Sequence, residues 1–309
     1  MNDYLTLSLG IIFAGVGGEL FVRGTVGIAS WARVSPGIIA TTIAAFATSS
    51  PELSVSINSA ISGVPQIALG DSLGSNVVNI ALILALALLI SGIQSPRGNI
   101  KREFPVALFI PIFTAMLFYD NELSRFDGLL LLSLFFTWLV AVVLEARKQR
   151  SATVDVLGEK RRWLAVLSCT VGLIFLVAAG GLIVTGAKGI AISFGLDEFI
   201  IGATIVALGT STPELATTVI AKVRGHDEVS LGTILGSNIF NGIFIIGVAA
   251  TIHPIRVALN DVAITLVFGF VALIFTYPSR TGLISRGQGV ALLMLYSGYL
   301  FSILQRQTT

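Results

Sequence analysis

The sequence predicts an all-α integral membrane protein with ten transmembrane helices, arranged as two five-helix repeats of inverted orientation. Three observations support this prediction: the composition, an internal duplication, and the distribution of basic residues among the loops. Hydrophobic residues make up 54% of the 309-residue chain and charged residues only 12%, and the mean hydropathy is +0.91. A soluble domain carries about 25% charged residues. Most of the surface of this protein must therefore face lipid.

Ten apolar segments are long enough to be considered as membrane spans, because a spanning helix needs about 20 predominantly apolar residues. Polar, turn-rich breaks separate them. The longest break, 145–162, follows the fifth segment. It divides the chain into a first repeat (1–145), a cytoplasmic linker (146–161) and a second repeat (162–309). The predicted spans are 4–30, 37–62, 66–92, 103–119, 126–145, 162–192, 199–222, 229–252, 260–277 and 287–304.

Two long stretches of the chain are copies of each other. Residues 38–79 and 200–241 align without a gap at an offset of 162 positions, and 18 of the 42 aligned pairs are identical. Each copy places a Pro-Glu pair inside an apolar segment, Pro51-Glu52 in the first and Pro213-Glu214 in the second. A carboxylate at membrane depth is costly and normally functional. The duplication therefore marks the candidate site.

Basic residues test the number and orientation of the spans, since Lys and Arg concentrate in cytoplasmic loops. If ten spans alternate, the loops after the odd-numbered spans collect 14 Lys and Arg residues, and the other side holds three, Arg125, Arg256 and Arg306. This asymmetry predicts that the linker is cytoplasmic and that both termini face outside. Five spans per repeat is an odd number, so the second copy enters the membrane in the opposite direction. Secondary transporters are often built this way, with ion sites near the midplane.

The duplicated segments carry a set of oxygen donors at matched positions. Each reads Thr-Ser-(Ser/Thr)-Pro-Glu, followed 22 residues later by Ser-Asn-x-x-Asn. Proline removes a helical hydrogen bond and leaves carbonyls free. Pro51 should therefore release carbonyls around Ala47 and Thr48, and its kink should also perturb Ala45. Pro213 should do the same near Gly209, Thr210 and Ala207. The other candidate residues are Thr48, Ser49, Glu52, Ser75 and Asn79, and Thr210, Ser211, Glu214, Ser237 and Asn241.

This donor set is typical of a hard-cation site. Carbonyl, hydroxyl and carboxylate oxygens suit Na⁺ or Ca²⁺ and do not suit soft metals. Ser75 and Asn79 are four residues apart, as are Ser237 and Asn241, so each pair shares a helix face. We expect each pair to face the Pro-Glu segment of its own repeat. Two ionised carboxylates balance one Ca²⁺, and competition by Na⁺ or protons would allow exchange.

The paired motifs resemble the α-repeats of the sodium/calcium exchanger superfamily, also called cation/Ca²⁺ exchangers, in its compact prokaryotic type. Its hallmark is G-T-S-x-P-E followed by G-S-N-x-x-(N/D) in each repeat, and the resemblance covers effectively the whole chain. It implies an antiporter of Ca²⁺ against Na⁺, or against H⁺ in some branches, in a plasma membrane, with no cofactor. It also implies that Glu52 and Glu214 are shared central ligands. Thr48, Ser49, Thr210, Ser211, Ser75, Ser237, Asn79 and the carbonyls of Ala45 and Ala207 would complete the ion sites.

Three positions depart from the family pattern. Asn241 stands where Na⁺/Ca²⁺-exchanging members often have Asp, which removes a charge and makes H⁺ a rival to Na⁺ as counter-ion. Ala47 replaces the usual Gly of the first motif. Asp71 stands where the second copy has Thr233. We interpret Asp71 as a charge near a helix N-terminus that complements the macrodipole, in preference to an acidic group of the site.

Other functions find less support in the sequence. A passive cation channel is the second class of function, and it would show no stimulation by a counter-ion. An intramembrane enzyme is disfavoured, because there is neither an HExxH motif nor a nucleophile–base arrangement. The single Cys169 and the distant His226 and His253 do not indicate a soft-metal site. No basic face suggests nucleic acid, and nothing in the sequence indicates an oligomeric state.

The remaining polar and small residues of the spans have structural interpretations. Asn76 and Asn238 are expected to form hydrogen bonds between packed helices. Glu19 is expected to pair with Arg23 one turn later on the same helix. The first and sixth spans are rich in glycine, which permits close helix contact. Our hypothesis is that these two spans slide against the other eight to alternate access to the site.

Overall fold

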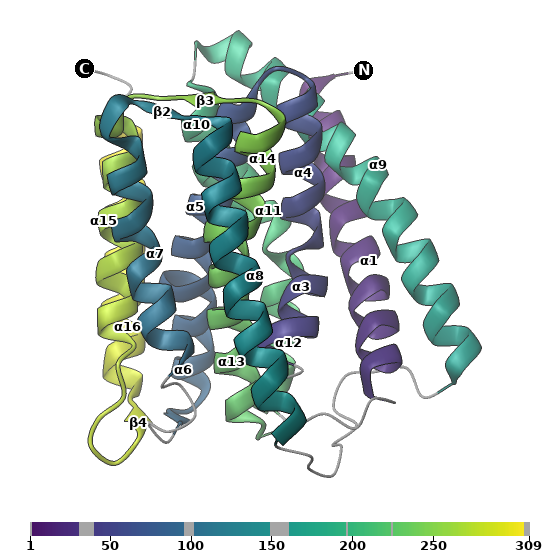
Figure 1. The fold of residues 1–309 in the computed structure, drawn as a ribbon, viewed down its shortest axis with the longest axis vertical. Coiled ribbons are helices and arrows are strands. Elements are labelled where there is room, and N and C mark those ends of the chain that lie inside the picture. Colours follow the sequence, from purple (N-terminus) through teal and green to yellow (C-terminus); the bar gives the residue numbers. More distant parts are fainter. Residues whose placement is uncertain are drawn as a thin grey trace.

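A computed structural model describes residues 2–30, 40–95, 102–148, 161–195, 197–223 and 225–305 as a bundle of helices (Figure 1). In the first half these are α1 (Asp3–Ser30), the π-helix η1 (Ala40–Ala44), α3 (Ala45–Thr48), α4 (Ser50–Ile61), α5 (Pro65–Val77), the π-helix η2 (Val78–Leu84), α6 (Ala85–Ile90), β1 (Ile93–Gln94), α7 (Glu103–Leu117), the 3₁₀ turn η4 (Phe118–Asp120), β2 (Glu122–Leu123) and α8 (Arg125–Lys148). In the second half they are α9 (Arg162–Phe194), α10 (Glu198–Ile201), the π-helix η5 (Gly202–Val206), α11 (Ala207–Thr210), α12 (Thr212–Val223), α13 (Asp227–Ile239), the π-helix η6 (Phe240–Ile245), α14 (Ile246–Ile252), β3 (Ile255–Arg256), α15 (Leu259–Phe275), β4 (Leu283–Ile284) and α16 (Arg286–Gln305).

Helices occupy all ten ranges that the sequence predicts as spans, but not all of them qualify as membrane crossings. Among the described residues, seven helical stretches are long and apolar enough to cross a bilayer, or eight when Glu198–Thr210 and Thr212–Val223, bent by 44°, count as one. The range 37–62 is interrupted near Ser49, and Leu259–Phe275 has only 17 residues. Ten crossings therefore stay a prediction. Most of the linker 146–161 lies outside the described residues.

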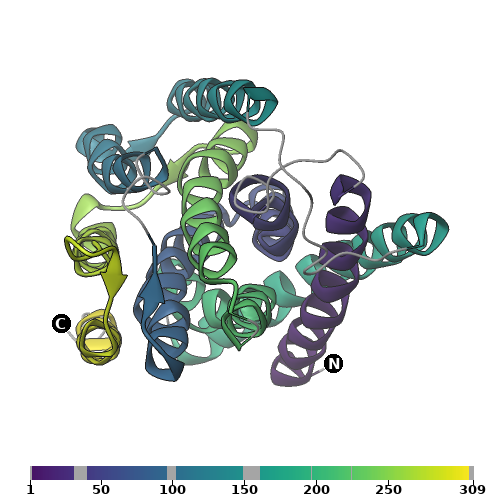
Figure 2. The same ribbon diagram turned by 90° about the horizontal axis from the view of Figure 1, so that it is seen from below.

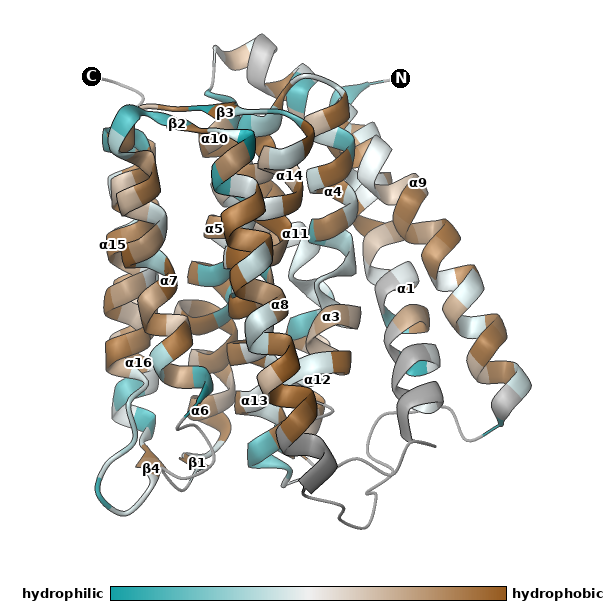
Figure 3. Cartoon of the chain, in the orientation of Figure 1, coloured by the Kyte–Doolittle hydropathy of each residue, from teal (hydrophilic) through white to brown (hydrophobic). Residues whose placement is uncertain are grey.

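The helices of the duplicated segments form the centre of the bundle. In an 18-residue apolar window of each stretch, the buried share is 89% for Asp227–Ile252 and 72% for Pro65–Ile90, against 22% for Arg286–Gln305 and 28% for Trp163–Ile190. The outer helices expose apolar side chains such as Phe136, Val140 and Ile174. Figure 3 shows the same hydrophobic character along α8, α9 and α15. Exposed apolar side chains over so much of the surface are expected for a protein in lipid.

Glycines bring the central helices of the two copies into backbone contact. A Cβ at Gly74 on α5 would lie 2.5 Å from the Ala203 carbonyl oxygen on η5. A Cβ at Gly236 on α13 would lie 2.5 Å from the Thr41 carbonyl oxygen on η1. These two contacts correspond under the 162-residue offset. Each copy therefore packs the later part of its duplicated segment against the earlier part of the other copy's segment.

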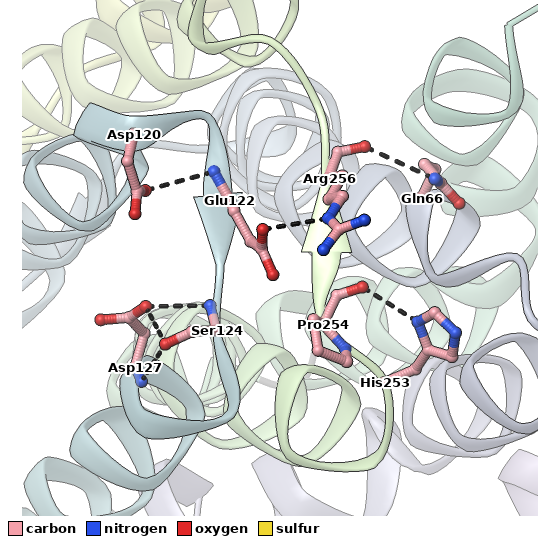
Figure 4. A network of polar contacts seen from close by, with 8 residues as sticks. All are labelled: Gln66, Asp120, Glu122, Ser124, Asp127, His253, Pro254 and Arg256. Atoms are coloured by element: carbon pink, nitrogen blue, oxygen red, sulfur yellow. Dashed lines mark hydrogen bonds and ion pairs between the residues drawn. The ribbon is translucent and has the colours of Figure 1, made fainter.

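Two short antiparallel strand pairs lie at opposite ends of the bundle (Figure 1). β1 pairs with β4, in the register Ile93 to Ile284, and β2 pairs with β3, in the register Leu123 to Ile255. The helix α1 begins, and α16 ends, at the end that carries β2 and β3 (Figure 1). At this end Arg256 donates a hydrogen bond to Glu122 at 3.0 Å (Figure 4). The strands therefore join the two halves of the chain at both ends.

The helices α1 and α9 pack against each other as a pair at one side of the bundle (Figure 2). A Cβ at Gly24 would meet the amide nitrogen of Cys169. A Cβ at Gly172 would lie 2.5 Å from the amide nitrogen of Phe21. The glycines predicted to permit close contact do so. The predicted ion pair on α1 is also confirmed, since Arg23 Nε donates to Glu19 Oε1 at 2.5 Å.

Candidate functional site

Each Pro-Glu motif lies directly after a helix break. In the first copy α3 ends at Thr48 and α4 begins at Ser50, and in the second α11 ends at Thr210 and α12 begins at Thr212. Pro51 and Pro213 are the second residues of α4 and α12, where the missing N–H is tolerated. The break aims the glutamate that follows into the centre of the bundle. Both glutamate side chains are fully buried.

The two glutamates are each contacted by a serine of the opposite copy. Ser49 donates a hydrogen bond to Glu214 Oε1 at 3.0 Å, and Ser211 donates to Glu52 Oε1 at 3.3 Å. The residues of these two bonds correspond under the 162-residue offset. The copies therefore meet at their Ser-x-Pro-Glu motifs and form one site between them.

Hydroxyl and carbonyl oxygens surround the glutamates. Thr48 Oγ1 lies 3.2 Å from Ser237 Oγ, and Thr210 Oγ1 lies 3.5 Å from Ser75 Oγ. Ser237 also donates to Glu214 Oε1 at 3.3 Å. All of these side chains are fully buried. The arrangement is a cluster of hard oxygen donors closed off from the surface.

The carbonyls of Ala45 and Ala207 also lie at this cluster. The Ala45 carbonyl accepts a hydrogen bond from Thr48 Oγ1 at 3.1 Å. The Ala207 carbonyl accepts from Ser75 Oγ at 3.5 Å and from Thr210 Oγ1 at 3.4 Å. Each carbonyl also accepts a backbone hydrogen bond, from Ser49 N at 3.0 Å and from Ser211 N at 3.2 Å, so neither is freed by the proline that follows.

The expectation that each serine faces the Pro-Glu segment of its own repeat is wrong for Ser75 and confirmed for Ser237, which donates to Glu214. Ser75 was expected to face the Pro-Glu segment of its own repeat, but it contacts Thr210 and Ala207 of the other copy. Ser237 contacts both copies, through Thr48 and Glu214. The reason is the glycine-mediated packing of α5 on η5, which turns Ser75 toward the opposite repeat.

The asparagines lie at the same level of the bundle. Asn76 Nδ2 donates to the Asn238 carbonyl at 3.2 Å, and Asn238 Nδ2 donates to the Asn76 carbonyl at 3.0 Å, so their predicted packing role is confirmed. Asn79 Nδ2 donates to Asn238 Oδ1 at 3.1 Å. Asn79 and Asn241 are the second residues of the π-helical segments η2 and η6, and π-helical turns recur at functional sites.

Several buried polar atoms of the site have no hydrogen-bond partner. They are Glu52 Oε2, Glu214 Oε2, Asp71 Oδ2, Asn79 Oδ1, and both Nδ2 and Oδ1 of Asn241. Buried polar groups are nearly always paired, and an unpaired group in a native fold needs an explanation such as an ion. Unpaired oxygens on matched residues of both copies fit the donor set of a hard cation.

The interpretation of Asp71 as a helix N-terminal charge is wrong. Asp71 is the seventh residue of α5, well past its first turn, and its side chain is fully buried. Its Oδ1 accepts hydrogen bonds from Thr210 at 2.9 Å and from Ser75 at 3.4 Å. Asp71 therefore belongs to the site. Among the described residues, no group of three acidic, histidine or cysteine side chains is placed to hold a metal ion.

The family of the chain follows from comparison with known proteins. The sequence model of the family described as sodium/calcium exchanger protein matches residues 3–144 and 164–305. The chain belongs to the sodium/calcium exchanger family. The matched residues leave out only the linker region and the ends, so the family assignment covers both copies of the motif.

Relatives of this exchanger family member cover nearly its full length. The putative antiporter CaxA of Alkalimonas amylolytica is 35% identical, over 91% of this chain and 92% of CaxA. The sodium/calcium exchanger MaX1 of Methanosarcina acetivorans is 29% identical, over 96% and 97%. A structure of the sodium-calcium exchanger NCX_Mj soaked with 2.5 mM Na⁺ and 10 mM Sr²⁺ superimposes with a TM-score of 0.70 at 30% identity, over 97% of this chain and 98% of that one. Exchangers and antiporters are transporters, in agreement with the expectation that the chain is not an enzyme.

Proposed function

We propose that this family member is a secondary antiporter that exchanges Ca²⁺ for Na⁺ by alternating access. The observation that carries the proposal is the pair of fully buried glutamates, Glu52 and Glu214, each with an unpaired oxygen and each contacted by a serine of the other copy. Two carboxylates balance one Ca²⁺. Without a cation, two unpaired buried charges would be strongly destabilising. The names of the relatives support this choice of ions.

We assign the transported ions to oxygens of both copies. Glu52 and Glu214 are the shared central ligands, because each lies at the contact between the copies. Hydroxyls, amide oxygens and the two carbonyls complete the coordination. Hydrogen bonds link the hydroxyls and carbonyls of this set to one another and to Glu214. The remaining ligands in this assignment are Thr48, Ser49, Ser75, Asn79, Thr210, Ser211, Ser237, Asn241 and the carbonyls of Ala45 and Ala207.

The two repeats (1–145 and 162–309) are related by an inversion in this proposal. Its support is the position of matched elements: β1 and β3 correspond under the 162-residue offset, yet they lie at opposite ends of the bundle (Figure 1). Together with the basic residues of the loops, this favours ten crossings in a plasma membrane. The linker 146–161 is then cytoplasmic, and both termini are extracellular.

Alternating access requires one group of helices to move relative to the site. In our proposal α1 and α9 move together, because glycines pack them as a pair. A hydrogen bond from Ser54 on α4 to the Leu176 carbonyl on α9, at 2.8 Å, restrains this motion and must break. A Cβ at Gly15 on α1 would lie 3.8 Å from Thr212 Cγ2 on α12. A disulfide between Gly15→Cys and Thr212→Cys should therefore stop exchange reversibly, and unchanged exchange after cross-linking would exclude this motion.

A proton-coupled Ca²⁺ antiporter is the second candidate. Its specific support is Asn241, which stands where exchangers of the Na⁺-coupled branch often have an acid, and whose amide is buried without a partner. One charge fewer at this position lowers the number of Na⁺ ions that the site can neutralise. The same two glutamates would then carry protons in the return step.

Ca²⁺ uptake into proteoliposomes separates these candidates. Vesicles containing the purified chain are loaded with Na⁺, or with acidic buffer, and diluted into Ca²⁺. Uptake driven by the Na⁺ gradient and abolished by Glu52→Gln and by Glu214→Gln is the expected result. Glu19→Gln is the matched control, since it removes a carboxylate from α1 outside the site, and it should retain uptake. Uptake driven only by protons would select the second candidate, and downhill flux indifferent to both gradients would indicate a channel.

A further inference from the structure

The two copies differ in charge at one buried position of the site. Asp71 on α5 corresponds to Thr233 on α13, and both side chains are fully buried. Thr233 Oγ1 has no hydrogen-bond partner, whereas Asp71 Oδ1 accepts two hydrogen bonds. The matched serines follow this difference: Ser75 donates to Asp71, while Ser237 donates to Glu214. The duplicated site therefore carries a carboxylate at Asp71 that its matched position, Thr233, lacks.

Asp71 is held at the site by backbone packing. It lies between Gly70 and Gly74. A Cβ added at Gly70 would meet the backbone of Phe199, and a Cβ added at Gly74 would lie 2.5 Å from the Ala203 carbonyl oxygen. A Cβ at Gly202 would likewise lie 2.9 Å from the Asp71 amide nitrogen. These contacts hold the backbone of Asp71 against η5, next to the segment that carries Thr210. The other carboxylate oxygen of Asp71, Oδ2, is buried and unpaired.

The charge of Asp71 has no cationic partner among the side chains that the structure describes, where the ion pairs involve other acids. Asp71 is linked to the glutamates through one short segment, since Thr210 donates to Asp71 and the next residue, Ser211, donates to Glu52. Buried charges are normally paired or coordinate a metal ion. If one Ca²⁺ is balanced by the two glutamates, Asp71 leaves a single negative charge for a monovalent cation.

We propose that Asp71 is an additional, charged ligand for Na⁺ on one side of the glutamates, beside Ser75, Thr210 and the Ala207 carbonyl, which the proposed function already assigns to the ion sites. Oxygen–oxygen distances of 2.9–3.5 Å link these four residues, and together they offer one charge and three neutral donors. The inference deepens the proposed function and rests on it. It also restores a third carboxylate to a site in which Asn241 lacks one.

This Na⁺ site lies on a definite side of the bundle. The helix α5 begins at the end that carries β2 and β3, where Gln66 Nε2 donates to the Arg256 carbonyl at 3.4 Å. Asp71 lies a few residues further along α5, and at 1.5 Å per residue it is about 8–9 Å from the start of the helix. An ion at Asp71 is therefore nearer to this end than to the end that carries β1 and β4.

Cation-dependent thermal unfolding of the purified full chain in detergent tests the site without transport. A ligand that binds the folded protein raises the melting temperature as its concentration exceeds its dissociation constant. Na⁺ is titrated at constant ionic strength against choline, and Ca²⁺ is titrated in the absence of Na⁺. The variants are Asp71→Asn, which keeps an acceptor for Thr210, and Asp71→Thr, which copies the second repeat. Ser72→Ala, which removes a buried unpaired hydroxyl one position further along α5, is the matched control.

We expect both Asp71 variants to need at least about tenfold more Na⁺ for half-maximal stabilisation, because ligand charge sets cation affinity. Their Ca²⁺ midpoints should move less than about threefold, since the two glutamates that balance Ca²⁺ are unchanged. Ser72→Ala should match the wild type in both titrations. A wild-type Na⁺ midpoint in Asp71→Asn, or an equal shift for Ca²⁺, would overturn the inference. The proposed function is judged separately by Na⁺-driven Ca²⁺ uptake of the wild type, which no Asp71 result affects.

Discussion

Adding one methyl group at Gly74 should separate the two copies at the site. The added Cβ of a Gly74→Ala variant would lie 2.5 Å from the Ala203 carbonyl oxygen, and its other close neighbours are backbone atoms that cannot rotate away. Ordinary contacts begin at 3.4 Å. The helices α5 and η5 must therefore separate by 0.9 Å, the difference between 3.4 and 2.5 Å. The neighbouring Ser75, already 3.5 Å from the Ala207 carbonyl, would lose that contact.

The size of the effect combines two opposed terms. Overpacking a rigid interface costs about 1–3 kcal/mol, and contact with backbone places Gly74→Ala toward the upper value. Replacing a helical glycine by alanine contributes about 1 kcal/mol in favour of folding. We therefore expect a net loss of about 2 kcal/mol of unfolding free energy, accompanied by weaker Ca²⁺ binding. Gly236→Ala, at the matched contact with Thr41, should behave alike.

Thermal unfolding in detergent, with and without Ca²⁺, measures both effects. The matched control is Gly298→Ala on α16. Its added Cβ would lie at an ordinary contact distance of 3.6 Å from the Phe268 ring, so only the favourable effect of alanine on helix stability remains. Gly298→Ala should be as stable as the wild type or more stable. The packing argument would be refuted if Gly74→Ala matched Gly298→Ala in stability and bound Ca²⁺ like the wild type.

Three further predictions concern contacts outside the site. Tyr299 donates to the Ala203 carbonyl at 2.8 Å, so Tyr299→Phe should cost about 1 kcal/mol of stability, measured by thermal unfolding, and no loss would mean that water replaces the bond. Lys222 is buried and forms an ion pair with Asp227 at 2.6 Å, so Asp227→Asn should cost about 3 kcal/mol of stability. The double variant Asp227→Asn with Lys222→Met should recover stability. Equal stability of the single and the double variant would contradict the unpaired-charge argument. Glu122→Gln breaks an exposed ion pair across β2 and β3 and should change stability by less than about 1 kcal/mol, with a larger change showing that this pair holds the end of the bundle.

Much of the architecture could be predicted because the membrane imposes strong patterns. Apolar segments located the helices, and the 162-residue duplication identified both glutamates and the serines that contact them. Pro51 and Pro213 predicted a perturbed backbone in the preceding turn, and the structure shows helix breaks there, at Ser49 and Ser211. These features follow from local rules of helix formation and from the cost of burying charge, both of which can be read in one sequence.

The parts that could not be predicted depend on how the two copies pack. The π-helical turns that contain Asn79 and Asn241 leave no sequence signal, because they arise from the fit between helices. Ser75 contacts the opposite copy, since Gly70 and Gly74 draw α5 onto η5. Asp71 was misassigned for the same reason. Its spacing of four from Ser75 was a usable signal, but only the start of α5 in the structure shows that Asp71 is not in the first turn.

The positions that match between the copies and the positions that differ have separate physical roles. Gly74 and Gly236, like Asn76 and Asn238, are equivalent pairs that hold the copies together by backbone contact and reciprocal hydrogen bonds. Both members of each pair need the same residue type, because a change in one member would make the two interfaces differ in packing or in hydrogen bonding. Asp71 has no such counterpart, and its side chain accepts hydrogen bonds from hydroxyls of the site. A duplicated fold can therefore keep its packing symmetric while its two ion-binding sides differ in charge, and such a difference allows one side to favour Na⁺ without altering the shared glutamates.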